Sequence, residues 1–178
     1  MSIRVRPANV ADAPALSRLA AKTFHDTFAA DNRPEDMAHY LAATFAPAIQ
    51  AAEIGDPAGV VLLAEHVDDA GGASALIGYA QLAAHTVPAA VTGPAPIEIK
   101  RLYVARDWHG RGVAQALMVA SLDAARARGR ATLWLGVWER NARAAAFYAR
   151  HGFVRVGEHA FVLGADVQTD WLLVRPVD

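Results

Sequence analysis

Small residues cluster at the point where an apolar stretch of the chain gives way to a helical one. Gly110, Gly112 and Ala114 alternate there with Arg111 and Val113. The first N–H groups of a helix lack carbonyl partners, and the helix dipole favours negative charge beside them. Residues with little or no side chain let phosphate oxygens come close to those N–H groups. This corner therefore predicts a binding site for a phosphate or pyrophosphate group.

A strand and a long helix must hold the corner in place. The segment 97–104 is rich in β-branched and aromatic residues, as strands are. After the corner, apolar residues recur at helical spacing and predict a helix that packs on a sheet: Val113, Leu117, Ala120 and Ala124. Gly129 suits the position that follows a helix C-terminus. The small residues therefore lie where the predicted helix begins.

The apolar side chains of the predicted strand change phase near its middle. Under strict alternation Ile97 and Ile99 point to one face, whereas Leu102 and Val104 point to the other. Lys100 and Arg101 stand between the two pairs, and such a slip predicts a β-bulge near the middle of the strand. A bulge leaves backbone N–H and C=O groups unpaired, so they are free to bind an extended ligand.

Two common phosphate-binding motifs do not fit the corner. A dinucleotide fingerprint would need glycine where Gln115 stands, and the chain has no G-x-x-x-x-G-K-[ST] sequence. The sequence HGRGVA at 109–114 instead resembles the Q/R-x-x-G-x-G/A signature of the Gcn5-related N-acetyltransferase (GNAT) superfamily. The departure is His109, where that superfamily usually has Gln or Arg. The backbone cradle does not depend on that side chain.

A second block of the chain resembles the same superfamily. The pattern N-x-x-A-x-x-F-Y-x-x-x-G-F begins at Asn141 and ends at Phe153. Together the two blocks cover roughly residues 97–160, and the resemblance implies one α/β domain spanning 1–178. Its sheet would be mixed and mostly antiparallel, with about seven strands and helices on both faces. The strands at 97–105 and 131–138 would splay apart to admit the pantetheine arm of coenzyme A.

Further strands are predicted on both sides of this unit. Apolar runs predict an antiparallel meander of 3–6, 59–66, 76–85 and 97–104. The segment 68–72 predicts a turn. The segment 131–138 predicts a strand that follows the long helix. We expect it to lie parallel to 97–104, connected through a right-handed crossover. A hairpin of 153–159 and 168–174 closes the chain.

The resemblance implies an acetyl-CoA-dependent N-acetyltransferase that acts by direct transfer in a ternary complex. The residues expected to contact acetyl-CoA are Leu102, Tyr103, Val104, His109, Gly110, Arg111, Gly112, Val113, Ala114, Asn141 and Phe147. Asn141 equally suits a simple helix N-cap, and Phe147 suits a wall of the core. The rival interpretation is a non-catalytic acyl-CoA-binding or regulatory module that kept the cradle.

Acetyl transfer needs a base for the amine and a proton donor for the departing thiolate. An alkylamine with a pKa of about 10 is mostly protonated at pH 7. Glu98 lies 11 positions before His109, where one branch of the superfamily carries its catalytic glutamate, so it is the expected base. Tyr148 matches the superfamily's tyrosine and is the expected acid. The alternatives are a salt-bridged strand carboxylate with water as the relay, and a tyrosine that only packs.

Segments at both ends resemble a narrower branch, the PaiA-type polyamine N-acetyltransferases. They are 23–37 and 134–170. This resemblance implies a polyamine-like acceptor, which acidic residues near the start of a second predicted helix would attract: Asp31, Glu35 and Asp36, with Asp166 or Asp170 as further candidates. The alternative interpretation is that these residues form the solvated, acidic end of an amphipathic helix and bind no substrate. A peptide or protein amine is the alternative acceptor.

Composition limits the other possibilities. Hydrophobic residues make up 54% of the 178 residues, which predicts a folded domain with a sizeable core. The net charge of −1 does not indicate a nucleic acid or a membrane as partner, and the absence of cysteine excludes disulfides and thiolate chemistry. The histidines form no metal-binding motif, so no metal is expected. Without a signal-like or spanning apolar segment we expect a cytoplasmic protein, and an apolar closing hairpin makes a homodimer unsurprising.

Overall fold

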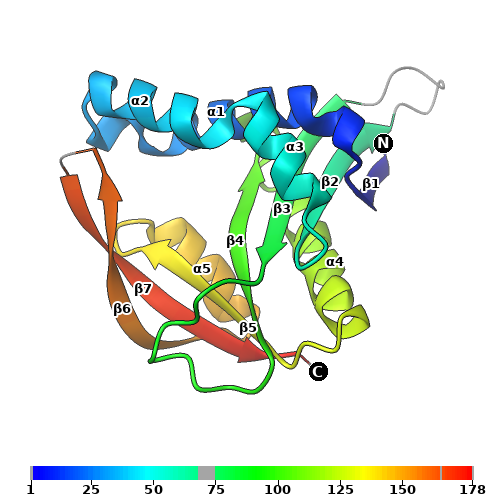
Figure 1. Ribbon diagram of the computed structural model, residues 1–178, viewed down its shortest axis with the longest axis vertical. Helices are drawn as coiled ribbons and strands as arrows, with labels where there is room; N and C mark the ends of the chain where they lie inside the picture. The colour runs from blue at the N-terminus through cyan, green and yellow to red at the C-terminus, as the bar shows by residue number, and fades with distance from the viewer. Residues whose placement is uncertain (1, 68–74, 165, 178) are drawn as a thin grey trace.

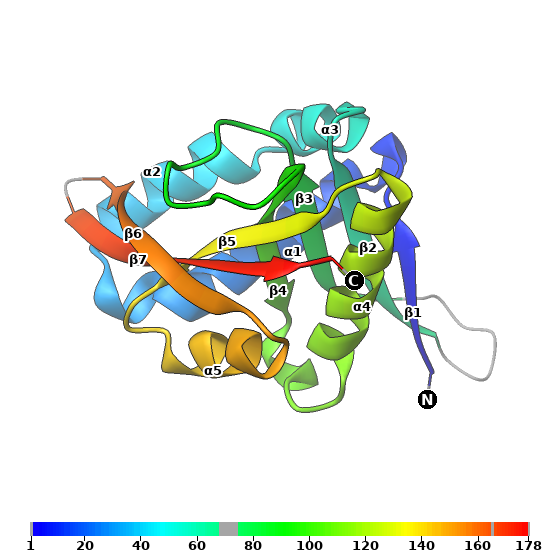
Figure 2. The same cartoon turned by 90° about the horizontal axis from the view of Figure 1, so that it is seen from below.

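The computed structural model describes residues 2–67, 75–164 and 166–177, so the turn predicted at 68–72 lies outside the described residues. Figures 1 and 2 show a twisted mixed sheet with helices on both faces. Its order is β1-β2-β3-β4-β5-β7-β6, which confirms the predicted seven-stranded sheet. The strands are β1 Ser2–Pro7, β2 Val60–Val67, β3 Ala75–Ala83, β4 Pro96–Val104, β5 Thr132–Trp138, β6 Val154–Leu163 and β7 Asp166–Pro176.

The two halves of the sheet are joined as predicted. Strands β1 to β4 pair with their neighbours antiparallel and form the meander. Strand β5 pairs parallel to β4 and is reached through helix α4, Val113–Ala127. Strand β7 lies between β5 and β6, so the closing hairpin extends the sheet on the far side of β5.

Helices cover both faces because side chains alternate along the strands. Leu63 and Tyr79 pack beneath α1 (Ala13–Phe28) and α2 (Pro34–Phe45), whereas Leu62 and Ala80 pack beneath α4. Helix α5, Ala142–Arg150, lies on the α4 side of the sheet, as Figure 2 shows. Helix α3, Pro47–Gly55, follows α2 directly and was not predicted. Among the described residues, no helix is long and apolar enough to cross a membrane.

The predicted bulge in β4 is confirmed. Gln81 of β3 faces Arg101 and Leu82 faces Ile99, so Lys100 is the extra residue. The insertion restores the phase of the strand: Ile97, Ile99, Leu102 and Val104 all pack against the α4 side of the core. The insertion also turns Arg101 to the opposite side, where its guanidinium lies 4.9 Å from the centre of the Phe45 ring.

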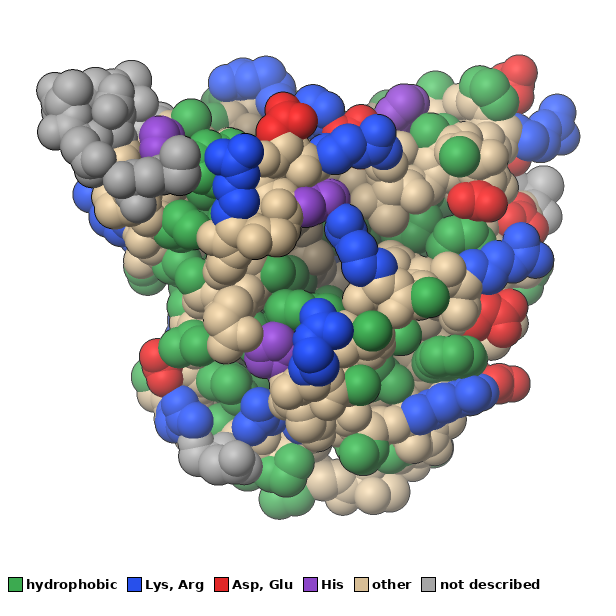
Figure 3. Space-filling view, turned by 180° about the vertical axis from the view of Figure 1, so that it is seen from behind, with side chains coloured by type: hydrophobic (Ala, Val, Ile, Leu, Met, Phe, Trp, Pro, Cys, Tyr) green, Lys and Arg blue, Asp and Glu red, His purple; other side chains and the backbone are tan. Residues whose placement is uncertain are grey.

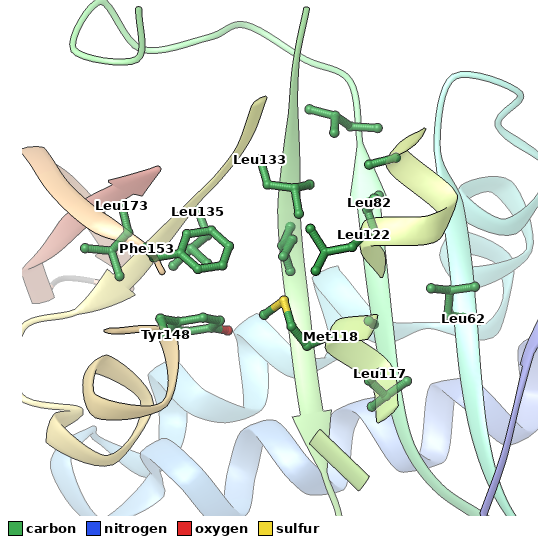
Figure 4. Packing of buried hydrophobic residues seen from close by; sticks show 14 of the residues in the cluster. Leu62, Leu82, Leu117, Met118, Leu122, Leu133, Leu135, Tyr148, Phe153 and Leu173 are labelled. Carbon is green, nitrogen blue, oxygen red and sulfur yellow. The ribbon is translucent and has the colours of Figure 1, made fainter. Parts of the chain in front are cut away.

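Strands β4 and β5 separate after a short paired stretch. Their register runs only from Pro96 opposite Thr132 to Glu98 opposite Trp134. The bulge lies just beyond the last pair, and from there β4 is bonded to β3 on its other side. Figure 4 shows Tyr148 of α5 in the widening gap, beside Phe153 and Leu135. The sheet is therefore splayed between β4 and β5, as expected.

Candidate active site

A cavity of about 450 Å³ lies between the N-terminus of α4 and helix α5, beside the end of β4. We call it the cofactor cleft. It is lined by ten of the predicted cofactor residues: Leu102, Tyr103, Val104, His109, Gly110, Gly112, Val113, Ala114, Asn141 and Phe147. Arg111 is not among the lining residues; its guanidinium lies 5.1 Å from the centre of the ring of Trp108, which does line the cleft. Figure 3 shows a hollow with basic side chains (lysine or arginine) and histidine side chains around it on this face.

The corner before α4 has the backbone that a phosphate site requires. Gly110 and Gly112 have φ angles of 75° and 82°, a left-handed conformation that side chains disfavour. No other atom lies within 4 Å of the place where a Cβ would stand on either glycine. The N–H of Ala116 donates to the carbonyl of Gly112 at 2.9 Å, so the N–H groups of residues 113–115 precede the helical hydrogen bonds. These donors are available at the cleft.

His109 is held by the side chain of Arg143 and by the backbone of Val104. Nη1 of Arg143, from α5, lies 2.7 Å from Nδ1 of His109, and Nε2 of His109 lies 2.9 Å from the carbonyl oxygen of Val104. A guanidinium only donates hydrogen bonds, so Nδ1 is the acceptor and Nε2–H donates to Val104. The ring thus carries no free donor toward the cleft. Arg143, which also lines it, brings a cation there instead.

Asn141 acts as the cap that the sequence predicted. Its Oδ1 accepts a hydrogen bond of 3.1 Å from the N–H of Ala144, which fixes the start of α5. The same residue lines the cofactor cleft and the neighbouring cavity described next. The cap therefore holds α5 at the junction of the two cavities.

A second cavity, of about 290 Å³, adjoins the cofactor cleft. We call it the acceptor cavity. The two share five lining residues: Leu102, Tyr103, Asn141, Ala144 and Tyr148. Five aromatic side chains from four elements form much of its wall: Phe24 and Phe28 of α1, Tyr40 of α2, Trp138 of β5 and Phe161 of β6. A molecule in this cavity would therefore meet apolar rings and reach the cofactor cleft at Tyr148.

Two carboxylate–histidine pairs also face the acceptor cavity. Nε2 of His85 lies 2.5 Å from Oε2 of Glu98, and Nε2 of His159 lies 3.9 Å from Oδ2 of Asp170. Burial raises the pKa of Glu98, and His85 opposes the rise. Burial likewise raises the pKa of Asp170, opposed by His159. Gly136 makes room for the second pair, because a Cβ there would lie 3.0 Å from Nε2 of His159.

The bulge forms the remaining polar wall and is tied to α3. Glu53 bonds Nζ of Lys100 at 2.7 Å and Nη1 of Arg101 at 2.6 Å. Arg101 also donates to Oε1 of Gln81 at 2.8 Å. Although burial opposes ionisation of Glu53, the two cations hold its pKa below the ordinary value. Both cations are therefore compensated.

Tyr148 lies at the junction of the two cavities. Its side chain is buried, and Figure 4 shows the hydroxyl oxygen directed away from α5 toward β4. Burial raises the pKa of this phenol, so it stays protonated at neutral pH. It can donate a hydrogen bond, but a complete proton transfer from it is harder than from an ordinary tyrosine.

The predicted acceptor residues on α2 are not brought into the acceptor cavity. Asp31 and Glu35 are exposed, and a Cβ on Gly164 would lie 2.2 Å from Oδ1 of Asp36, which places Asp36 against the β6–β7 turn. None of the three lines either cavity. Helix α2 turns Met37 inward and Tyr40 toward the acceptor cavity, which leaves its acidic first turn outside. The three carboxylates therefore lie outside the lining of the acceptor cavity, and a role for them at its mouth stays a prediction.

Sequence reasoning missed four polar residues of the site. They are His85, Arg143, His159 and, except as a secondary candidate, Asp170. Both histidine–carboxylate pairs depend on the register of the sheet: His85 follows Ala83, the last residue of β3, which faces Glu98, and His159 faces Asp170. A polar side chain directly opposite a carboxylate in a predicted hairpin is the signal that would have identified the His159 pair.

Comparison with known proteins gives consistent matches. A model described as the acetyltransferase (GNAT) family matches residues 15–153. An uncharacterized N-acetyltransferase from the pepI 3′ region of Lactobacillus delbrueckii subsp. lactis is 36% identical over 162 residues, 91% of this chain and 90% of its own. One from Mycobacterium tuberculosis is 34% identical over 165 residues, 92% of this chain and 97% of its own. The crystal structure of a PaiA N-acetyltransferase from Thermoplasma acidophilum, in complex with coenzyme A, has a TM-score of 0.74 at 18% identity, covering 99% of both chains.

Proposed function

Because the chain belongs to the acetyltransferase (GNAT) family and is an acetyl-CoA-dependent acetyltransferase, we propose that its acceptor is a small polyamine-like molecule with a primary amine. One observation carries this proposal. The acceptor cavity combines aromatic walls with two carboxylates, Glu98 and Asp170, and it adjoins the cofactor cleft. A small molecule with apolar segments between cationic groups suits such a lining.

The cofactor cleft fits acetyl-CoA. Open space at Gly110 and Gly112, beside the free N–H groups at the start of α4, suits a pyrophosphate. The edge of β4 at Leu102 and Tyr103, which β5 does not pair, suits an extended amide chain, whereas the carbonyl of Val104 is bonded to His109. The PaiA N-acetyltransferase of the same fold was solved in complex with coenzyme A, which supports coenzyme A as the kind of ligand. When bound, acetyl-CoA supplies the thioester carbonyl carbon that the amine attacks.

Glu98 is the proposed base. It lies where β4 and β5 part, and its side chain lines the acceptor cavity. Because burial raises its pKa, the carboxylate is a stronger base than an exposed glutamate. Glu98 would accept a proton from the acceptor's ammonium group at Oε1 or Oε2. Asp170, on the far strand of the same cavity, would bind the acceptor's second cationic group.

Tyr148 is the proposed hydrogen-bond donor to the departing sulfur. Its position at the junction of both cavities supports this role. Its raised pKa keeps the proton on the phenol, so its main contribution is to stabilise developing negative charge by donating a hydrogen bond. Asn141, by capping α5, holds Tyr148 at that junction.

A homodimer through the closing hairpin is part of the proposal. The hairpin leaves large apolar side chains exposed: Val154, Val156, Val162 and Val167. Strand β6 forms an edge of the sheet, where unpaired backbone groups can bind another copy. Light scattering of the purified protein tests this directly.

Thiol release from acetyl-CoA over a panel of amines tests the proposed acceptor. The panel needs spermidine, putrescine, a monoamine of matched length, free amino acids and a peptide with a free N-terminus. We expect turnover with the polyamines to exceed that with the monoamine. Highest turnover with the peptide would point to a protein acceptor, and binding of acetyl-CoA without turnover on any amine would point to a non-catalytic module.

A further inference from the structure

The acceptor cavity has to lose a proton in every turnover. An ammonium acceptor carries three hydrogens on nitrogen. One remains on the amide product, one ends on the thiol of coenzyme A, and the third must leave for the solvent. Glu98 is the proposed first acceptor of that third proton, but only 15% of its side chain is exposed. A carboxylate so enclosed needs a route to water.

The route that the geometry offers is His85. We propose that His85 carries the proton from Glu98 out to bulk water, an inference that rests on the base assignment above. Nε2 of His85 lies 2.5 Å from Oε2 of Glu98, a hydrogen-bond distance. Of the His85 side chain, 42% is exposed, so the ring reaches from the carboxylate to the surface. Imidazole is suited to this role because it has two nitrogen atoms, one for each direction of transfer.

The proton balance of the relay is as follows. The N–H bond of the ammonium breaks and an O–H bond forms on Glu98. That O–H then breaks as an N–H bond forms at Nε2 of His85, and Nδ1 of the same ring releases its own proton to water. A ring flip or proton exchange returns His85 to its starting tautomer, and Glu98 is again a carboxylate. His85 touches Glu98 and not the acceptor in this scheme, so it is a relay and positioning residue.

Other groups around Glu98 do not offer the same outlet. Lys100, two positions along β4, is bonded to Glu53 of α3 at 2.7 Å. Arg101 is bonded to the same carboxylate and is buried. His159 of β6 faces the cavity from the other side, with its Nε2 3.9 Å from Asp170 of β7. Among the groups that face Glu98 in the described structure, His85 combines direct contact with exposure.

His159 provides a matched control. It is a histidine in the same cavity, paired with a carboxylate, and 41% of its side chain is exposed, against 42% for His85. Replacing His159 removes an imidazole ring that lies beside Asp170 and leaves the contact between His85 and Glu98 in place. A proton-relay defect should follow His85→Ala and not His159→Ala.

Chemical rescue tests the relay. In a weak, low-concentration buffer His85→Ala should lower kcat by about tenfold or more, as is usual for loss of a proton-transfer group. Adding imidazole should restore a large part of kcat in His85→Ala. It should have no such effect in His159→Ala or in Glu98→Gln. The double variant His85→Ala/Glu98→Gln should be no slower than Glu98→Gln alone, because His85 acts through Glu98.

A titration without substrate tests the contact itself. Glutamate labelled with ¹³C at the carboxyl carbon reports the pKa of Glu98, identified by its loss in Glu98→Gln. The contact with His85 lowers that pKa, so His85→Ala should raise it, whereas His159→Ala should move it less. If the wild type acetylates amines, two results would overturn the relay. One is a kcat of His85→Ala equal to that of the wild type, and the other is a lowered kcat that imidazole does not restore. If no amine is turned over, the proposed function fails instead, and an unchanged Glu98 titration in His85→Ala overturns the pairing.

Discussion

Nη1 of Arg143 donates a hydrogen bond of 2.7 Å to Nδ1 of His109, which joins helix α5 to the turn before α4 across the mouth of the cofactor cleft. The contact explains how histidine can stand at a position where the family usually has Gln or Arg. The Nε2–H group of His109 donates to the carbonyl of Val104, so the ring has no donor left for the cofactor. Arg143 then places the cation beside the predicted phosphate site.

The first prediction concerns this pair. Arg143→Ala should weaken acetyl-CoA binding about 3- to 10-fold, since an exposed charge contact contributes roughly 1 kcal/mol. His109→Gln should bind almost as the wild type does, because an amide can accept from Arg143 and donate to Val104. Isothermal titration with acetyl-CoA measures both. Arg111→Ala is the control, because Arg111 lies over Trp108 and outside the cleft lining. An equal loss of affinity for acetyl-CoA in Arg111→Ala would contradict a specific role of Arg143 in binding.

The second prediction concerns the glycine corner. Gly112→Ala should lower the free energy of unfolding by about 1 kcal/mol, because its φ of 82° disfavours a side chain although there is space for one. Gly112→Asp should in addition weaken acetyl-CoA binding by at least tenfold through like charge beside phosphate.

Gly129 provides the matched control for that experiment. It has a φ of 65° and open space at the other end of the same helix. Gly129→Asp should therefore lower the melting temperature as Gly112→Asp does and leave the affinity for acetyl-CoA unchanged. Equal affinity in both aspartate variants would place the phosphates elsewhere.

The third prediction separates a tyrosine at the reaction centre from one in the core. Tyr148→Phe should lower kcat about 10- to 100-fold with little change in acetyl-CoA affinity, since the lost hydrogen bond acts on the departing sulfur. Tyr79→Phe is the control, because Tyr79 is also buried, its hydroxyl has no hydrogen-bond partner among the described residues, and it lines neither cavity. That variant should be as stable as the wild type or more so.

The pH profile adds a second test of Tyr148. Burial raises the pKa of the phenol above its ordinary value of 10.0, so Tyr148 does not deprotonate below that pH. The basic side of the rate profile should therefore be the same in the wild type and in Tyr148→Phe. A basic limb below pH 10 that disappears in the variant would contradict the direction of the shift.

Features within one element could be predicted from the sequence, and contacts between elements largely could not. The phase slip in β4 predicted a bulge near the middle of the strand, which the register then assigns to Lys100, and Asn141 predicted the cap of α5, because each depends on neighbours in the chain. Helix α3 was missed, although Pro47 is a common first residue of helices. Helix α3 contributes to the site through Glu53, which accepts a hydrogen bond from Arg101, a residue 48 positions away in the chain.

The acidic residues illustrate the same limit. Asp31, Glu35 and Asp36 are close in sequence to a segment that borders the acceptor cavity, yet the helix directs them elsewhere. Glu98 and Asp170 are far apart in sequence and face one cavity, because the order β4-β5-β7 brings their strands together. Spacing along the chain does not encode that order.

The fourth prediction is a pair of stability effects with opposite signs. Burial raises the pKa of Asp170 above its ordinary value of 3.8, so ionisation costs folding free energy, and this cost appears as the pH rises from that value through the raised pKa. Asp170→Asn should therefore melt at a higher temperature than the wild type at pH 7.5, with the difference vanishing toward pH 3.8.

Asp12 provides the opposite case. A hydrogen bond from Arg6 holds the pKa of Asp12 below 3.8, although burial opposes this. Its contribution is present above pH 3.8 and is lost as the pH falls through the lowered pKa. Asp12→Asn should therefore melt below the wild type at pH 7.5. Thermal melts of both variants from pH 7.5 down to about pH 2 test the two signs. The higher melting temperature of Asp170→Asn should disappear as the pH falls toward 3.8, whereas the lower melting temperature of Asp12→Asn should persist to pH 3.8 and disappear only below it.

The last prediction distinguishes carboxylates inside the acceptor cavity from those outside it. If Asp170 binds the second cationic group of a polyamine, Asp170→Asn should lower kcat/KM for spermidine by about tenfold and leave the value for a matched monoamine nearly unchanged, since pairing in an enclosed site exceeds an exposed pair. The triple variant Asp31→Asn/Glu35→Gln/Asp36→Asn removes more charge but none from the cavity. Its loss should be under about threefold and should disappear at high ionic strength, where exposed charges are screened. The loss in Asp170→Asn should persist at high salt. A larger and salt-sensitive loss in the triple variant would mean that the acidic turn of α2, and not the cavity, selects the acceptor.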